Sequence, residues 1–256
     1  MPVQLHQYAH QSDNYGVLVH DEETGKTACI DVGDPAALRR ALDVTGWALD
    51  QIWITHHHAD HTNGLEEIKA ETGAEVTGPG YDTGKTVPGL DHRVVEGDTV
   101  ELGATVFEVL HTPGHTLDML NYHCAAEGLL FSGDTLFMMG CGRIFEGTPE
   151  MMWESLQKLA ALPGDTMVYC SHEYTVANAK FALSVDPDNQ ALIARAAKVE
   201  DMRVRKKATV PGLLSVEFET NPFLRASDSA IRAHLGMVDA SDVEVFTEIR
   251  KRKDSF

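Results

Sequence analysis

The sequence predicts a layered α/β sandwich at residues 1–173, followed by a smaller, mostly helical domain at residues 174–256. Short apolar stretches rich in β-branched and aromatic residues run through the first part, separated by Gly, Pro and Asp and alternating with a few helical segments. After residue 173 this strand pattern fades and helical periodicity replaces it. The 256 residues suffice for one large domain with a smaller one attached.

The expected elements follow one another at short intervals. Pro149 is placed as an early residue of one helix, and Pro163-Gly164 ends that helix. Strands are expected at 15–19, 27–30, 51–55, 105–110, 129–131 and 167–170, and helices at 35–43, 64–72, 149–162, 174–184, 190–207, 228–235 and 243–250.

The charge of the chain is strongly acidic but unevenly distributed. The formal net charge is −18, yet residues 195–256 carry +2 and the remainder carries −20. Such a surface disfavours nucleic acid and anionic membranes as partners, whereas a small anionic substrate is better received near the C-terminal segment. No apolar run spans a bilayer and no secretory signal is evident, so we expect a cytoplasmic protein, and we expect it to be a monomer.

The cysteines argue against a disulfide framework and against a zinc ribbon. They are scattered and form no C-x-x-C pair, so buried free thiols in a reducing compartment are expected. The four are Cys29, Cys124, Cys141 and Cys170.

A dense group of metal-competent side chains directly follows one apolar expected strand. In Thr55-His56-His57-His58-Ala59-Asp60-His61, four imidazoles and a carboxylate occupy six consecutive positions of a predicted loop. These groups suit zinc, iron and manganese. Because alternate residues can point the same way, His56 and His58 can reach one ion while Asp60 and His61 reach another. A chance surface run of histidines is the alternative, and the buried strand that leads into the run argues against it.

Three later strand ends carry one further metal-competent residue each. They are His115, Asp134 and His172, and each stands in a tight, polar turn. A lone histidine in a turn is more often structural than a ligand, so each of these positions is weak alone. If the strand ends converge on one edge of the sheets, the residues form two ion sites with Asp134 between them.

The motif at residues 55–61, with the three later positions, resembles the metallo-β-lactamase superfamily and, within it, the glyoxalase II (hydroxyacylglutathione hydrolase) family. This resemblance implies an αββα sandwich followed by a helical domain that helps to bind glutathione. Further matching segments extend over most of the chain: Asp13-Asn14-Tyr15, His111-Thr112-Pro113-Gly114-His115-Thr116, Ser132-Gly133-Asp134-Thr135-Leu136-Phe137, Cys141-Gly142-Arg143-Ile144-Phe145-Glu146-Gly147-Thr148, His172-Glu173-Tyr174-Thr175, Asn221-Pro222-Phe223-Leu224-Arg225 and Arg250-Lys251-Arg252-Lys253-Asp254.

The resemblance also implies the ligands of two divalent ions per chain. Zinc is expected, with iron or manganese as alternatives. Asp60 and Asp134 are the carboxylates of the implied catalytic centre, and Asp60 is interpreted as a ligand rather than as a general base. The implied sets are His56, His58 and His115 for the first ion and Asp60, His61 and His172 for the second, with Asp134 bridging the two.

Four positions match glutathione contacts of the resembled family: Arg143, Tyr174, Arg250 and Lys253. Arg250 and Lys253 are three residues apart on a short predicted helix, so they share a face and could clamp one carboxylate. The alternative for this pair is a solvated basic helix end that complements the helix dipole. The alternatives for Tyr174 and Arg143 are a core aromatic at a domain joint and a surface cation.

Three segments depart from the family pattern. Phe145 stands where many relatives have Tyr, which removes a possible hydroxyl contact to substrate. Asp118-Met119 replaces a usual Gly-His, which puts the local geometry there in doubt. Asp31-Val32-Gly33-Asp34 stands in for a more common Asp-Pro-Gly, and Asp31 is either a hydrogen-bond partner of a ligand histidine or a strand-end turn residue. His57 is expected to point away from the ions.

The implied reaction is hydrolysis of S-lactoylglutathione, an S-2-hydroxyacylglutathione, to D-lactate and glutathione, as in methylglyoxal detoxification. A hydroxide held by the two ions attacks the thioester carbonyl, and no G-x-S-x-G nucleophile motif is found. The alternatives within the superfamily are a persulfide dioxygenase, a lactonase and a β-lactamase. A non-catalytic metal-binding or nucleic-acid module is a further alternative, which the lack of cysteine ligands and the acidic surface disfavour.

Overall fold

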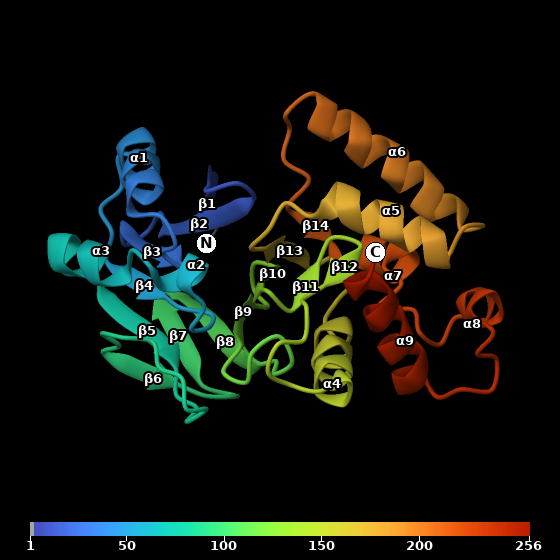
Figure 1. Cartoon of the computed structure of the whole chain (residues 1–256). Coiled ribbons are helices and arrows are strands. Elements are labelled where there is room, and N and C mark those ends of the chain that lie inside the picture. Colours follow the sequence, from blue (N-terminus) through green and yellow to red (C-terminus); the bar gives the residue numbers. More distant parts are fainter. Residues whose placement is uncertain (1–2) are drawn as a thin grey trace. The chain divides into compact units, whose positions relative to one another are not determined.

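The computed structural model describes residues 3–256, which divide into two compact units (Figure 1). The first unit comprises the chain up to His111 together with Leu117–Gly133, and the second comprises Thr112–Thr116 together with Asp134–Phe256. The domain boundary that the sequence predicts after residue 173 stays a prediction. In the described part of the chain, no helix is both long and apolar enough to cross a bilayer.

A six-stranded sheet opens the first unit, with its strands in the order of the sequence. Strands β1 to β3 pair antiparallel, whereas β3 to β6 pair parallel. Helices fill the connections from β3 to β4 and from β4 to β5. The elements are β1 (Val3–His10), β2 (Asn14–Asp21), β3 (Lys26–Ile30), α1 (Pro35–Thr45), β4 (Gln51–Trp53), α2 (Ala59–Thr62), α3 (Leu65–Thr72), β5 (Glu75–Pro79) and β6 (His92–Val94).

Strand β4 lies in the middle of the core of this unit, because its side chains alternate between two buried faces. Ile52 and the following Ile54 belong to one apolar cluster that also contains Leu38 of α1 and Leu65 of α3. Trp53 points the other way and packs against aromatic side chains of a second sheet, its ring centroid 4.9 Å from that of Phe107. The residues that follow β4 therefore start from a rigid support.

The first unit also contains four strands of a second sheet, which form an antiparallel meander. Its strands β8 and β10 end next to the two turns that carry His115 and Asp134. Tyr122 of this sheet donates a hydrogen bond from its hydroxyl to the Ile54 carbonyl, 2.8 Å away. The strands are β7 (Thr99–Leu102), β8 (Thr105–His111), β9 (Leu120–Cys124) and β10 (Leu129–Gly133).

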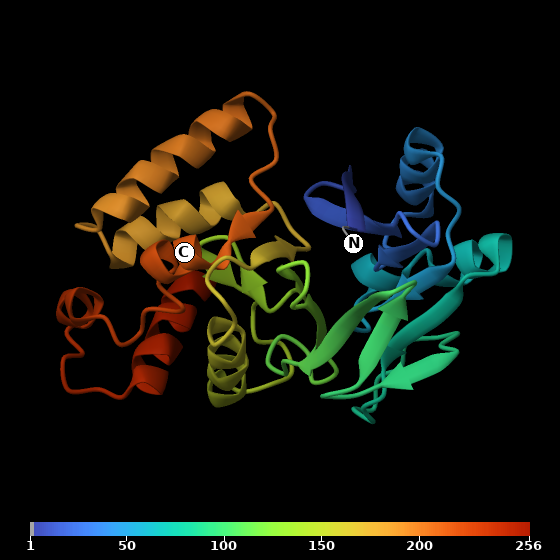
Figure 2. The same cartoon turned by 180° about the vertical axis from the view of Figure 1, so that it is seen from behind.

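The second unit combines two short strand pairs with most of the helices. Helices α5 and α6 lie side by side in Figure 1 and Figure 2, and the rings of Phe181, Phe223 and Phe246 pack between helices. The pairs β11–β12 and β13–β14 are antiparallel. The elements are β11 (Leu136–Phe137), β12 (Gly140–Cys141), α4 (Pro149–Ala160), β13 (Met167–Cys170), α5 (Thr175–Val185), α6 (Gln190–Val204), β14 (Gly212–Leu213), α7 (Leu214–Thr220), α8 (Ser229–Leu235) and α9 (Asp242–Asp254).

Each strand and helix expected from the sequence has a counterpart, but several elements were missed. Strand β1 was missed because its sequence VQLHQYAH lacks an apolar run and most of it is only partly buried. The loop expected after β4 is confirmed up to His58 but is wrong for the rest of the motif, since Ala59–Thr62 forms the short helix α2 with His58 as its N-cap. The strand signal does fade after residue 173, and only the two-residue strand β14 lies beyond that point.

Candidate metal centre

The histidine motif gathers three imidazoles in the first unit. Thr55 and His56 continue from β4 and are buried, while Asp60 and His61 lie in the single turn of α2. The ring centroid of His56 lies 4.7 Å from that of His58 and 4.1 Å from that of His61. The strand end and the short helix thus bring these predicted ligands of the first unit together.

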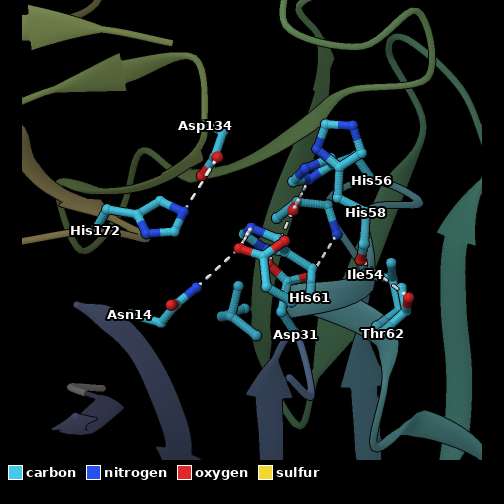
Figure 3. Close-up of polar contacts among 12 residues, drawn as sticks. Asn14, Asp31, Ile54, His56, His58, His61, Thr62, Asp134 and His172 are labelled. Atoms are coloured by element: carbon cyan, nitrogen blue, oxygen red, sulfur yellow. Dashed lines mark hydrogen bonds and ion pairs between the residues drawn. The ribbon is translucent and has the colours of Figure 1, made fainter. Parts of the chain in front are cut away.

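Asp31 organises this group from the end of β3. Its Oδ1 accepts the backbone N–H of Thr55 at 2.8 Å, and its Oδ2 accepts the Thr55 hydroxyl and Nδ1 of His61, each at 2.8 Å (Figure 3). Asp31 is buried and has a φ of 58°, a left-handed conformation that aspartate tolerates better than most residues. Of the two alternatives left open for Asp31, the structure shows the hydrogen-bond partner of a histidine.

These hydrogen bonds fix which ring nitrogen carries the proton. The hydroxyl of Thr55 donates its proton to Asp31, so it must accept from Nδ1 of His56, 2.9 Å away. His61 likewise donates its Nδ1 proton to the Asp31 carboxylate. In a neutral imidazole the lone pair then lies on Nε2, which makes Nε2 of both rings the atom available to a metal ion.

The second unit fixes His115 in the same way. Its Nδ1 lies 2.7 Å from the backbone carbonyl of Arg143, which only accepts hydrogen bonds, so Nδ1 carries the proton. Nε2 of His115 lies 3.4 Å from Oδ2 of Asp134, and Nε2 of His172 lies 3.2 Å from the same oxygen (Figure 3). Two predicted histidine ligands thus converge on one carboxylate oxygen of a third predicted ligand, Asp134.

The residues present fit divalent metal ions. In the neutral form of His115, Nε2 has no proton to give to Asp134, so two electron pairs would face each other across 3.4 Å unless an ion lay between them. The first unit repeats this arrangement, because Nε2 of His61 lies 3.4 Å from Oδ2 of Asp60. Two atoms that each bind one zinc ion at about 2.1 Å lie about 3.0–3.4 Å apart, depending on the bond angle. The spacing and the N/O chemistry of the described residues match those of ligands sharing an ion, and both suit zinc, iron or manganese.

Two side chains that sequence reasoning left without a role support the motif. Asn14 is buried at the start of β2 and donates from Nδ2 to Oδ2 of Asp60 at 3.0 Å (Figure 3). Asp118 is buried too, and its Oδ1 lies 2.9 Å from Nδ1 of His57. The Asp118-Met119 departure thus supplies a partner for His57. The similarity of Asp13-Asn14-Tyr15 to the family pattern was the only sequence signal for Asn14.

Two of the four predicted glutathione contacts are accessible. The ring of Tyr174 is stacked on that of His172, with a centroid distance of 4.7 Å, and 37% of Tyr174 is exposed. The exposed guanidinium of Arg143 lies 5.4 Å from the centroid of the Phe145 ring. Phe145 is itself exposed and contacts the ring of His115 edge-on, at a centroid distance of 5.2 Å.

Arg250 and Lys253 differ from each other. Arg250 is only 7% exposed and donates to the carbonyl of Cys141 at 3.0 Å and to Asp254 at 2.8 Å. Its burial excludes the alternative of a solvated helix end at this position. Lys253 is half-buried over the rings of Phe181 and Phe256. Burial, followed by the nearby Arg250 charge, lowers the pKa of Lys253.

Comparison with known proteins assigns both parts of the chain. Residues 14–172 match the model of the metallo-β-lactamase superfamily, and residues 173–256 match the model of the hydroxyacylglutathione hydrolase C-terminus. A relative from Maricaulis maris named hydroxyacylglutathione hydrolase is 52% identical over 98% of this chain and 98% of its own length. One of the same name from Brucella anthropi is 50% identical over 99% of this chain and 97% of its own.

Two solved structures show the same fold. That of ETHE1 from Myxococcus xanthus has a TM-score of 0.69 and 25% identity, over 98% of this chain and 90% of its own. A protein solved in a di-iron-bound form, TTHA1623, has a TM-score of 0.62 and 23% identity, over 85% of this chain and 98% of its own.

Proposed function

The chain belongs to the hydroxyacylglutathione hydrolase family, with a metallo-β-lactamase domain followed by the helical domain of that family, and we propose that it cleaves S-2-hydroxyacylglutathiones. S-lactoylglutathione and water would give D-lactate and glutathione, the hydrolytic step of methylglyoxal detoxification. The observation that carries the proposal is the set of histidines whose Nδ1 protons are held by Asp31, Thr55 and the Arg143 carbonyl.

All seven predicted ligands belong to a single dinuclear centre in this proposal. Asp134 supports the role of a bridge, because two histidines converge on one of its oxygens. Zinc is the proposed metal, with iron or manganese as alternatives. The proposed ligands are His56, His58 and His115 for one ion and Asp60, His61 and His172 for the other, with Asp134 shared.

The protein side chains hold the ligands in position while the ions supply the chemistry. When bound, the two divalent ions would make hydroxide available near neutral pH and polarise the thioester carbonyl. Asn14 donates to Oδ2 of Asp60, which favours the ionised carboxylate and supports the proposal that Asp60 is a ligand rather than a general base. Glutathione leaves as a thiolate, which needs no proton from the protein. The proposed mechanism therefore includes no general acid for the leaving group.

Substrate binding is proposed for the four predicted contacts. Tyr174 presents a partly exposed ring beside the proposed ligand His172. Arg143 and Lys253 supply positive charge, and Arg250 supports the site from within the core. The net charge of +2 in residues 195–256, in an otherwise acidic chain, supports binding of an anionic thioester by this segment.

Metal removal tests the reaction. Purified protein stripped by a chelator is expected to lose hydrolysis of S-lactoylglutathione and to regain it with zinc, iron or manganese. Retention of full activity after stripping would overturn the metal-dependent mechanism. A ratio of two metal ions per chain is expected, and a ratio of one, with activity towards persulfides or lactones instead, would favour a different enzyme of the superfamily.

Lys253→Met tests the glutathione assignment more cleanly than Arg250→Ala, because Arg250 is buried and its loss would disturb the core. Methionine is unbranched and of similar length, so it can still lie over the rings of Phe181 and Phe256, but it removes the charged Nζ that lies over them and the 3.4 Å hydrogen bond from Nζ to the Ala177 carbonyl. We expect KM for S-lactoylglutathione to rise about tenfold, the effect of about 1.4 kcal/mol of lost binding, and hydrolysis of a thioester without glutathione to stay unchanged. Lys251→Met, which removes an exposed charge from the same helix, is the matched control. Equal KM values for both variants would contradict the role of Lys253.

The proposal includes a monomer in the cytoplasm. The four cysteines are buried free thiols, and burial raises the pKa of Cys29 and of Cys170 to about 12. Such thiols stay protonated and do not compete for metal ions near neutral pH.

A further inference from the structure

The hairpin that runs from Asp134 to Arg143 carries two groups that the proposed metal centre needs. Asp134 begins it, and the carbonyl that orients His115 belongs to Arg143 at its other end. The two ends are in close contact. The N–H of Gly142 donates to the Thr135 carbonyl at 3.1 Å, and a Cβ on Gly142 would lie 1.9 Å from the Asp134 carbonyl oxygen. Any shift of the hairpin would therefore move both groups together.

The tip of this hairpin is buried and is held by side chains of the helices. Met139 adopts a left-handed φ of 54° and is fully buried, so its backbone N–H needs a partner from the protein. Oε2 of Glu217 on α7 accepts this N–H at 2.7 Å. The carbonyl of Met138 accepts from Nδ2 of Asn178 on α5 at 3.1 Å.

Asn221 connects both strands of the hairpin. Its Nδ2 lies 3.2 Å from the Phe137 carbonyl on β11 and 2.9 Å from the Gly140 carbonyl on β12. The same nitrogen lies 3.1 Å from Oε2 of Glu217, so the two side chains form one network. Asn221 and Glu217 are both fully buried.

The charge of Glu217 is balanced on the side away from the hairpin. Arg195 of α6 forms an ion pair with Oε1 of Glu217, which leaves Oε2 to the hairpin and to Asn221. A buried carboxylate without such a partner would be strongly destabilising. The network therefore anchors the hairpin to two helices, α6 and α7.

We infer that Asn221 and Glu217 are positioning residues for the metal centre: they fix the hairpin so that Asp134 and the Arg143 carbonyl keep the geometry that metal binding requires. This inference rests on the proposed function and gives the helical part a role besides contacting glutathione. Groups that orient metal ligands typically change metal affinity by about 10–100-fold when removed.

Asn221→Ala tests this role, with Asn189→Ala as the matched control. Asn189 lies in the same unit, and its Nδ2 donates to Asp186 and to the Glu219 carbonyl, each at 2.8 Å. It thus makes bonds of the same kind but none to the hairpin. The measurements are the zinc dissociation constant by chelator competition, kcat and KM for S-lactoylglutathione, and the melting temperature of the metal-free chain.

Both variants are expected to melt earlier than wild type, because each loses buried or half-buried hydrogen bonds. Only Asn221→Ala is expected to bind zinc about tenfold or more weakly and to lose kcat at unchanged KM. Zinc affinities that match between the two variants would overturn the inference while leaving the proposed function intact. A wild-type chain that binds none of zinc, iron and manganese would overturn the proposed function itself.

A milder variant covers the case in which Asn221→Ala does not fold. Asn178→Ala removes one bond to the Met138 carbonyl and opens space beside Gly140, whose added Cβ would lie 2.4 Å from Nδ2 of Asn178. We expect weaker zinc binding than in Asn189→Ala here too, and unchanged zinc affinity would count against the positioning role.

Discussion

Asp31→Asn separates the charge of Asp31 from its shape. Asparagine is nearly isosteric with aspartate and tolerates the φ of 58°. One carboxylate oxygen, however, becomes an NH2 donor. If the amide oxygen keeps the Thr55 N–H, the NH2 group faces Nδ1 of His61, which must then accept a hydrogen bond. The proton of His61 moves to Nε2, and the lone pair is lost from the nitrogen that the proposed ion needs.

The size of the effect follows from the three hydrogen bonds that Asp31 accepts. A bond to a charged group contributes about 1.5–3 kcal/mol and a bond between neutral groups about 0.5–1.5 kcal/mol. Replacing the carboxylate by an amide is therefore expected to lower the free energy of unfolding by about 3 kcal/mol. Asp31→Ala removes all three bonds and places alanine in a left-handed conformation, which adds about 1–2 kcal/mol.

Urea unfolding of the metal-free chain measures the stability loss, and chelator competition measures zinc affinity. We expect Asp31→Asn to be more stable than Asp31→Ala, yet both to bind zinc about 10–100-fold more weakly than wild type. Wild-type zinc affinity in Asp31→Asn, combined with the expected loss of stability, would refute the argument that Asp31 sets the tautomer of His61.

Two further predictions concern acid stability and use urea unfolding at several pH values. Burial lowers the pKa of His123, and the charge of Glu108 opposes this only in part. The unfolded chain therefore binds a proton at this residue more readily, so the free energy of unfolding falls as the pH drops below about 6.5. His123→Leu should reduce this loss between pH 7 and pH 5, and an unchanged pH dependence would contradict the prediction. Burial raises the pKa of Asp21, but bonds from Thr24 and Thr105 outweigh it and leave the pKa lowered from 3.8. The Asp21 carboxylate therefore stabilises the fold above about pH 4, where Asp21→Asn should have a lower free energy of unfolding than wild type. This difference in free energy should vanish as the pH falls through the lowered pKa of Asp21. A difference that stays constant with pH would contradict the prediction.

The presence of a metal site could be predicted because its signals are local in the sequence. A run of β-branched and aromatic residues leads directly into the histidine motif, and each later proposed ligand follows an apolar strand. The support of the ligands is not local. Asp31 lies 24 residues before Thr55 and 30 before His61, and its left-handed backbone leaves no pattern in the sequence. Only the parallel pairing of β3 with β4 brings Asp31 next to the motif.

The basic C-terminal helix α9 is a case in which a local sequence pattern did not predict which side chains are buried. Spacing places Arg250 and Lys253 on one face of α9 but does not tell which face of the helix is buried. In the structure Phe246 and Ile249 are fully buried, and Arg250, next to Ile249 in the sequence, is drawn into the core with them. A buried arginine needs acceptors, which are the Cys141 carbonyl and Asp254. The sequence predicts the same role for Arg250 and Lys253, but only Arg250 is buried in the core. Substitution of Arg250 therefore disturbs the core as well as any contact with substrate.

The burial of Arg250 bears on the hairpin as well. The Cys141 carbonyl that it holds lies two residues before Arg143, whose own carbonyl orients His115. Helices α5, α7 and α9 thus each supply a side chain to the backbone of one ten-residue hairpin, at Met138, Met139 and Cys141 respectively. A loss of substrate affinity in an Arg250 variant would consequently have two causes, the lost positive charge and the displacement of the hairpin. The metal affinity of that variant distinguishes the two, since a contact made only to glutathione leaves zinc binding unchanged.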